Sequence, residues 1–152
     1  PTQLGNDRVA DAIGAVAFYG APVIVFDLGT ATTVGVVNED KCFIGGMIIP
    51  GVKTSLSALT TRASQLPTIN IEKPKHIIGR NTIECMQSGI IHGTAAMIDG
   101  IISDILPSFG NQPVKIVATG GMSKQIMPHC KHEIAVEPHL QFKGIFHATK
   151  EL

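Results

Sequence analysis

The chain has 152 residues, of which 44% are hydrophobic, and its 12 lysines and arginines balance 12 aspartates and glutamates. This length predicts one domain with a sizeable core, and the hydrophobic fraction excludes a disordered chain. Zero net charge argues against a nucleic-acid-binding protein, which would carry clustered lysine and arginine. No unbroken apolar run approaches the ~18 residues of a membrane span, so we expect no membrane partner.

The cysteines and the first residues bear on where the protein works. Cys42, Cys85 and Cys130 are odd in number and widely spaced, which favours reduced thiols in the cytoplasm over a disulfide framework. The chain opens with the segment 1–3, which has no methionine, and it shows no export leader. Because a helical pattern begins almost at once, we interpret this start as the truncation of a longer protein.

The first half of the chain shows a helix pattern, a series of strand patterns and a second helix pattern. In chain order the predicted elements are a helix over 5–19, strands over 23–27, 32–37 and 42–49, and a helix over about 52–65. The polar residues 38–41 predict a hairpin turn between the second and third strands. Prolines at 67 and 74 predict an irregular segment over 66–78.

The second half contains a long apolar helix pattern followed by shorter elements. The predicted elements are a helix over 83–106 capped by Asn81, a strand over 114–118, a helix to about 127, a strand over 134–136 and a helix over 144–150. Gly89, Gly93 and Gly100 each weaken the long helix by up to ~1 kcal/mol relative to alanine, so we expect another backbone to pack closely there. The whole pattern indicates a layered α/β domain.

The segment that follows the first predicted strand has the composition of a phosphate-binding turn. Asp27 ends an apolar strand, Gly29 permits a tight turn, and threonine hydroxyls follow from Thr30 onward. The carboxylate of Asp27 can serve a cation or a metal-bound water. The alternative is an ordinary β-turn in which Asp27 forms an Asx-turn.

A second candidate segment, Gly5–Arg8, stands at the start of the first helix. Asp7 can accept the proton of an alcohol, and the planar fork of Arg8 suits a carboxylate. The two side chains together could therefore position a small molecule that carries both groups. The alternative is a capped helix with an exposed Asp7–Arg8 ion pair.

Two glycine-rich segments suggest close backbone approach. Gly45–Gly51 resembles a P-loop, but Val52 separates Gly51 from Lys53 where that loop needs them adjacent. These glycines predict instead a strand that passes close to a ligand or to another strand. The segment 119–121 lies between a predicted strand and a helix, where its glycines would let a nucleotide approach, although a plain turn is an equal alternative.

Histidine and cysteine gather in Pro128–His132, with His139 and His147 further on. The segment has no CxxC pair, and its spacing fits no standard zinc finger. We expect a solvated surface segment. A zinc protein that uses His129, Cys130 and His132 is kept as a third functional hypothesis.

Taken together, these segments resemble type III pantothenate kinases in type and in order. The matching segments are Gly5–Arg8, Asp27–Thr33, Gly45–Gly51, Leu66–Pro67, Asn81–Thr82 and Thr119–Gly121. The resemblance implies an α/β, ribonuclease H-like (actin-like ATPase) domain with helices packed on a mixed β-sheet, one half of a two-domain kinase. No segment matches the Asp-x-Gly-Asn loop of the family's N-terminal domain. Residues 1–152 are therefore expected to be the C-terminal domain, including the substrate segment 5–8.

The resemblance also implies a reaction and its requirements. Family members are cytoplasmic, typically homodimeric kinases that transfer the γ-phosphoryl group of ATP to pantothenate, the first step towards coenzyme A. They need a monovalent cation, potassium or ammonium, and magnesium is expected with ATP. The partners expected here are therefore pantothenate and a second copy of the chain, without nucleic acid or membrane.

Site roles follow from the matched positions. For the substrate, the resemblance implies that Gly5, Asn6, Asp7 and Arg8 bind pantothenate, with Asp7 as general base, and that Thr82 also contacts pantothenate. For the nucleotide, it implies that Thr30 touches ATP phosphate and that Gly120 and Gly121 lie near the adenosine. It also implies that Asp27 holds the monovalent cation. Because one wall of the cleft is missing, we expect the isolated chain to have no useful kinase activity. The alternative is a non-catalytic family member that acts as a binding or transcriptional accessory protein, although the intact Asp7–Arg8 pair favours an enzyme.

Overall fold

The computed structural model describes residues 4–150, so the predicted truncated start at 1–3 lies outside the described residues. The helices and strands are α1 (Asn6–Tyr19), β1 (Val23–Leu28), β2 (Ala31–Val37), β3 (Phe43–Pro50), α2 (Val52–Arg62), α3 (Thr82–Ile105), β4 (Lys115–Thr119), α4 (Ser123–Ile126), β5 (Ala135–Val136) and α5 (Leu140–Lys150). Short 3-10 turns, η1 (Leu106–Phe109) and η2 (Met127–His129), follow α3 and α4. The predicted order of elements is confirmed, but α5 begins at Leu140 rather than at Gly144.

The five strands form one mixed sheet in the order β3-β2-β1-β4-β5. The predicted hairpin is present, since β1, β2 and β3 pair antiparallel, whereas β4 pairs parallel to both β1 and β5. Asp27 near the end of β1 lies opposite Thr33 of β2 and Thr119 of β4. The carboxyl ends of β1 and β4 therefore meet at one edge of the sheet.

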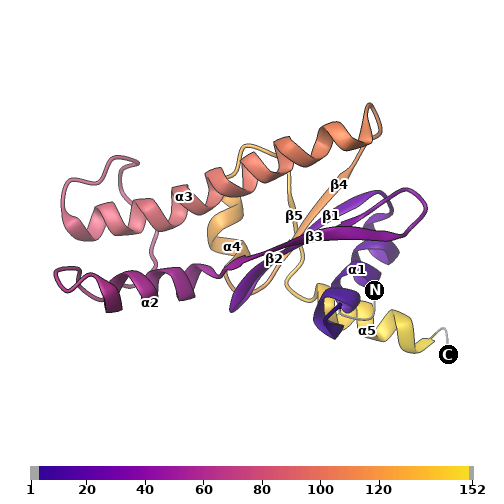
Figure 1. The fold of residues 1–152 in the computed structure, drawn as a ribbon, viewed down its shortest axis with the longest axis horizontal. Coiled ribbons are helices and arrows are strands. Elements are labelled where there is room, and N and C mark those ends of the chain that lie inside the picture. The colour runs from indigo at the N-terminus through magenta and orange to yellow at the C-terminus, as the bar shows by residue number, and fades with distance from the viewer. Residues whose placement is uncertain (1–3, 151–152) are drawn as a thin grey trace.

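Helices cover both faces of the sheet, as Figure 1 shows. On one face Ile24 and Phe26 of β1 pack into the main hydrophobic cluster together with residues of α3 and α4. On the other face Val23 and Val25 pack with α1 and α5. Because side chains alternate along a strand, Asp27 belongs to the face that α1 covers.

The long helix α3 begins as the sequence predicts. The Asn81 side chain accepts a hydrogen bond from the Glu84 backbone N–H at 2.9 Å, and the Glu84 carboxylate accepts from the Arg80 N–H at 3.0 Å. The Glu84 carboxylate thus accepts from the N–H of Arg80. In a standard capping box it would accept from the N–H of the cap residue, here Asn81. Ile98 and Ile102 are fully buried against the sheet and hold the helix in place.

The outer side of α3 bears on two expectations. Beyond the adjacent residues and the nearby backbone of α3 itself, no atom of the described residues lies within 4 Å of a Cβ placed on Gly89, Gly93 or Gly100, so no other backbone of the same chain packs there. The stretch Thr82–Phe109 is also long and apolar enough, by length and composition alone, to cross a membrane: an 18-residue window within it has a mean hydropathy of 1.3, a value that core helices of soluble proteins also reach. A search for unbroken apolar runs does not find this helix, because small and polar residues separate its isoleucines. Only 22% of that stretch is buried.

Helices α1 and α5 cross at two glycines. A Cβ on Gly14 would lie 2.6 Å from the Leu140 carbonyl oxygen, and a Cβ on Gly144 would overlap the Ala10 carbonyl oxygen. The two backbones therefore touch directly. This contact fixes α5 against α1 and so steadies the helix that carries Asp7.

We expect Gly144→Ala to lower the free energy of unfolding by about 1–3 kcal/mol, because the added methyl group forces the two helices apart. Gly100→Ala is the matched control: its Cβ enters open space inside a helix, so it should raise stability by about 0.5–1 kcal/mol. Urea unfolding followed by circular dichroism measures both. Equal stability of the two variants would contradict the observed crossing.

Candidate functional site

The turn after β1 is held in place by contacts with the start of α2. The Thr54 hydroxyl donates to the Thr30 carbonyl oxygen at 2.8 Å. A Cβ on Gly51 would overlap that same carbonyl oxygen and lie 2.6 Å from the Gly29 carbonyl oxygen. The glycine therefore lets the α2 backbone lie against the turn. Thr30 itself is exposed at the tip, where its hydroxyl can meet a ligand.

The turn after β4 packs against Asp27. Gly120 has φ +89°, a left-handed conformation that favours glycine. A Cβ there would lie 2.5 Å from Asp27 Oδ1, and the Met122 N–H donates to the Leu28 carbonyl oxygen at 3.3 Å. Gly120 therefore lies against Asp27 and the Leu28 backbone, and the nucleotide contact expected for this turn stays a prediction. Gly121 follows on the exposed side.

The segment Gly5–Arg8 forms the cap and first turn of α1. Gly5 is the N-cap residue in an extended conformation, without a side-chain cap. Asp7 Oδ1 lies 2.6 Å from the place a Cβ on Gly5 would take, so the carboxylate folds back over the start of the helix. Asn6 and Asp7 are both exposed. The negative charge of Asp7 also suits the positive end of the helix dipole.

The Arg8 side chain turns inward to the β2–β3 hairpin. Its Nη2 donates weakly to the Val34 carbonyl oxygen at 3.4 Å, and its guanidinium carbon lies 5.4 Å from the centre of the Phe43 ring. A Cβ on Gly46 would lie 2.9 Å from Nη2 and would overlap the Val34 carbonyl oxygen. The predicted close strand approach is therefore found at Gly46. Within residues 4–150 no Asp7–Arg8 ion pair forms, and the buried Arg8 Nε has no hydrogen-bond partner.

Asp11 is a site residue that the sequence analysis missed. It is only 4% exposed, and its Oδ1 has no hydrogen-bond partner. Burial, with the charges of Asp27 and Asp7, raises the pKa of Asp11 to about 7. Burial and the charge of Asp7 also raise the pKa of Asp27. Asp11 follows Asp7 by one helical turn, and this spacing could have placed both on one side of α1.

A polar hollow of about 700 Å³ adjoins these turns. Its lining comes from α2, from the segment after α2 and from the turn after β4, namely Lys53, Ser57, Thr60, Asn70, Gly121 and Gln125, with other residues of the same segments. Lys53 directly precedes Thr54, which bonds the turn after β1. The hollow and the Asp27–Thr30 turn are therefore neighbouring parts of one edge of the domain.

Thr82 lies apart from the predicted substrate segment at the start of α1. It is exposed in the first turn of α3, whereas α1 lies at the opposite end of the molecule (Figure 1). Within one chain, the structure therefore brings Asp7, Asp27 and Gly120 together and leaves Thr82 apart.

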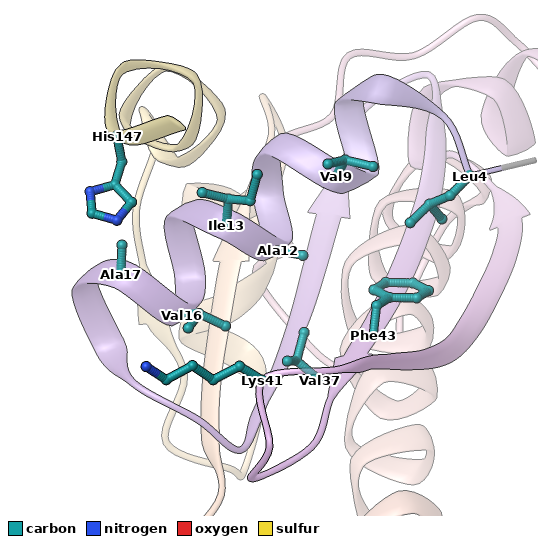
Figure 2. A pocket seen from close by; sticks show the side chains of 10 residues that line it. All are labelled: Leu4, Val9, Ala12, Ile13, Val16, Ala17, Val37, Lys41, Phe43 and His147. Carbon is teal, nitrogen blue, oxygen red and sulfur yellow. The ribbon is translucent and has the colours of Figure 1, made fainter. Parts of the chain in front are cut away.

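An apolar groove of about 590 Å³ runs along the outer side of α1 (Figure 2). Leu4, Val9 and Phe43 line one end of it, and His147 lies at the other. None of the predicted site residues lines the groove. The groove is therefore separate from the carboxylates of Asp11 and Asp27, which lie between α1 and the sheet.

The zinc hypothesis finds no support in the described part of the chain. Among residues 4–150 no three histidine, cysteine, aspartate or glutamate side chains form a group that could hold a metal ion. His132 Nδ1 lies 2.9 Å from the Asp99 carboxylate, which also accepts the Lys131 N–H. Burial raises the pKa of the Cys130 thiol to about 11, so it stays protonated and is a poor metal ligand. These residues anchor the segment after η2.

The mixed sheet, the helices on both faces and the two turns at one sheet edge define an actin-like ATPase fold. Solved structures agree. A Campylobacter jejuni protein assigned to the Baf family of transcriptional activators is 20% identical, with a TM-score of 0.68 over 98% of this chain and 65% of that one. The ethanolamine utilization protein EutJ of Carboxydothermus hydrogenoformans is 16% identical, with a TM-score of 0.53 over 90% of this chain and 52% of that one.

Component A of the Acidaminococcus fermentans (R)-2-hydroxyglutaryl-CoA dehydratase is 15% identical, with a TM-score of 0.53 over 91% of this chain and 64% of that one. The present chain thus spans between about half and two thirds of the length of these three structures. The family model of type III pantothenate kinase matches residues 1–104. The chain belongs to the type III pantothenate kinase family.

We expect Asp11→Asn to stabilise the protein at pH 8 by on the order of 2–4 kcal/mol and to change little at pH 4. The raised pKa means that the folded protein keeps a proton that the unfolded chain releases between about pH 4 and pH 7. Asp11 therefore costs stability as the pH rises through this range, and asparagine removes the cost. Thermal unfolding at several pH values measures the effect, and an equal gain at pH 4 and pH 8 would contradict a buried, proton-holding Asp11.

Proposed function

We propose that the protein is a pantothenate kinase, and that residues 1–152 form the C-terminal wall of a two-domain cleft in which ATP phosphorylates the primary alcohol of pantothenate. One observation carries the proposal: Asp27 near the end of β1 belongs to the sheet face that α1 covers, where burial and the charge of Asp7 raise its pKa. The candidate base at the start of α1 and the candidate nucleotide turn after β1 therefore lie on one side of the sheet. Membership of the pantothenate kinase family supports the substrate.

The nucleotide end of the proposed site is built from turns. The exposed Thr30 would donate to phosphate oxygens of ATP, and the polar hollow beside Gly121 would take the adenosine. The left-handed Gly120 brings this second turn against Asp27, so phosphates and adenosine would bind to one rigid edge. Such positioning is the main contribution that a protein makes to phosphoryl transfer.

The carboxylates need a positive partner. Burial raises the pKa values of Asp11 and Asp27, and the charges of the neighbouring aspartates raise them further. Asp27 would hold the monovalent cation, potassium or ammonium, that membership of the family implies. The cation would offset the negative charge there, and magnesium would accompany the ATP phosphates.

The alcohol end of the proposed site is the first turn of α1. Asp7 is exposed and would accept the proton of the pantothenate hydroxyl as it attacks the γ-phosphoryl group. Gly5 leaves room for the Asp7 carboxylate, and Gly5 and Asn6 would contact the substrate. Arg8, the fourth residue of this segment, would contact pantothenate only after its guanidinium leaves the β2–β3 hairpin.

Thr82 fits this scheme only with a second chain. Its place at the far end of α3 puts it out of reach of Asp7 in the same protomer (Figure 1). In a homodimer packed through α3, the Thr82 of one protomer would instead face the substrate of the other. The exposed small residues Gly89, Gly93 and Gly100 on α3 support this packing, because they let two helices approach closely.

We expect Gly93→Leu to convert the proposed dimer to a monomer, because the leucine would stand where the partner helix packs. The same change should not unfold the monomer, since no atom of the described chain lies within 4 Å of a Cβ at this position. Analytical ultracentrifugation measures the mass. Leu59→Gln, another exposed helix position, is the control. A Gly93→Leu protein that stays dimeric would contradict packing through α3.

The alternative function is that of a non-catalytic binding or transcriptional accessory protein. The similar Campylobacter jejuni structure, whose description places it among transcriptional activators, favours this alternative. The two proposals differ in one respect: an accessory protein has no use for a base beside the nucleotide turn. Phosphorylation of pantothenate by the complete protein separates them.

We expect Asp7→Asn to lower turnover of pantothenate by the complete protein by about 10²–10⁴-fold, because asparagine cannot accept the alcohol proton. Turnover is measured with ATP, pantothenate and potassium chloride, and circular dichroism checks the fold. Asp40→Asn, an exposed aspartate in the turn after β2, should retain full activity. Full activity of Asp7→Asn would rule out Asp7 as the base, and no turnover by the unmodified protein would favour the accessory function.

A further inference from the structure

A second cavity, of about 650 Å³ and open to solvent on one side, adjoins the hollow proposed for the nucleotide. It is enclosed by the segment 72–77, by the middle of α3 and by α4 with η2. Gln125 is the one lining residue that it shares with the hollow beside Gly121. Apart from Gln125, none of the residues placed in the proposed kinase site lines this cavity, so phosphoryl transfer gives its charged residues no role.

The lining of this cavity is strongly basic. The charged or titratable side chains around it are Lys73, Lys75, His92, Lys124 and His129, with Glu72 as the one acidic group among them. This excess is local, because the whole chain carries as many acidic as basic residues. A concave surface lined by one sign of charge concentrates ions of the opposite sign.

Two histidines face each other inside the cavity. The rings of His92 on α3 and His129 on η2 stand edge to face, with centroids 4.9 Å apart. Burial, His92 and Lys73 lower the pKa of His129. Lys75 and Lys124 line the same cavity from the loop and from α4, and Glu72 alone opposes them. Neutral imidazoles donate hydrogen bonds, and a bound anion would favour their charged forms.

The lysine-bearing segment is held against α3. Ile71 packs against the main hydrophobic cluster, and Pro74 is buried. The Ser88 hydroxyl donates to the Ile77 carbonyl oxygen at 2.5 Å, and the Gln87 side chain donates to the Asn70 carbonyl oxygen at 3.4 Å. The backbone that carries Lys73 and Lys75 is therefore fixed on both sides. A ligand would therefore have to order the exposed lysine side chains but not the backbone that carries Lys73 and Lys75.

We propose that this cavity is a binding site for a multiply charged phosphate anion, separate from the nucleotide site. Three lysines from two elements, with two histidines between them, match the several negative oxygens of a pyrophosphate-like group. The cavity volume exceeds that of a single phosphate and leaves room for a larger phosphorylated ligand. The inference goes beyond the proposed kinase function and does not depend on it.

The test is isothermal titration of the protein with inorganic pyrophosphate at pH 7.5, without magnesium. We expect one site per chain, weakened by about tenfold in Lys73→Gln and again in Lys124→Gln. Lys115→Gln, an exposed lysine at the start of β4, is the matched control and should bind as the unmodified protein does. In proton NMR, saturating pyrophosphate should raise the pKa of His129.

Three results would overturn the proposal. One is the absence of binding at millimolar pyrophosphate. Another is an equal loss in Lys115→Gln, which would mean attraction by overall charge alone. The third is loss of binding in Thr30→Ala with no loss in Lys73→Gln, which would place pyrophosphate in the nucleotide turn. This test does not measure kinase turnover. A failure to bind pyrophosphate would therefore leave the proposed kinase function untouched, and an absence of kinase activity would leave the proposed anion site untouched.

Discussion

The candidate site depends on direct backbone contact between three turns at one edge of the sheet. Gly51 lies against the carbonyl oxygens of the turn after β1, and Gly120 lies against Asp27 from the other side. A side chain at either glycine would separate the turns, because protein interiors leave no room for an added methyl group. The parallel pairing of β1 with β4 brings these turns to the same edge, and the glycines let them close on each other.

Helix α1 completes the site by bringing negative charge to this edge. Its first turn carries Asp7, and its next turn buries Asp11 near Asp27. Burying carboxylates close together is unfavourable, as the raised pKa of Asp11 indicates. Such an arrangement is typical of functional sites, where a cation or a substrate relieves the repulsion. The Gly14–Gly144 crossing with α5 holds α1 in this position.

The long helix α3 has two different faces. Ile98 and Ile102 on its inner face belong to the core, whereas its outer face offers small residues to the surroundings. Only 22% of its apolar stretch is buried in this chain. A helix that is apolar beyond its buried face has surface for a further contact, and the proposed second protomer would cover it and bring a second Thr82 to the site.

Local patterns in the sequence were sufficient for the order of the elements, the Asn81 cap, the hairpin and the Asp27 turn, because helix periodicity, strand alternation and capping depend on neighbouring residues. The joint order of motifs also led to the family. Only the tertiary structure decided that Asp11 joins Asp7 and Asp27, that Arg8 turns to the hairpin, and that the α3 glycines face outward. Those facts depend on strand order and helix packing, which bring together residues far apart in the chain and which no local pattern encodes.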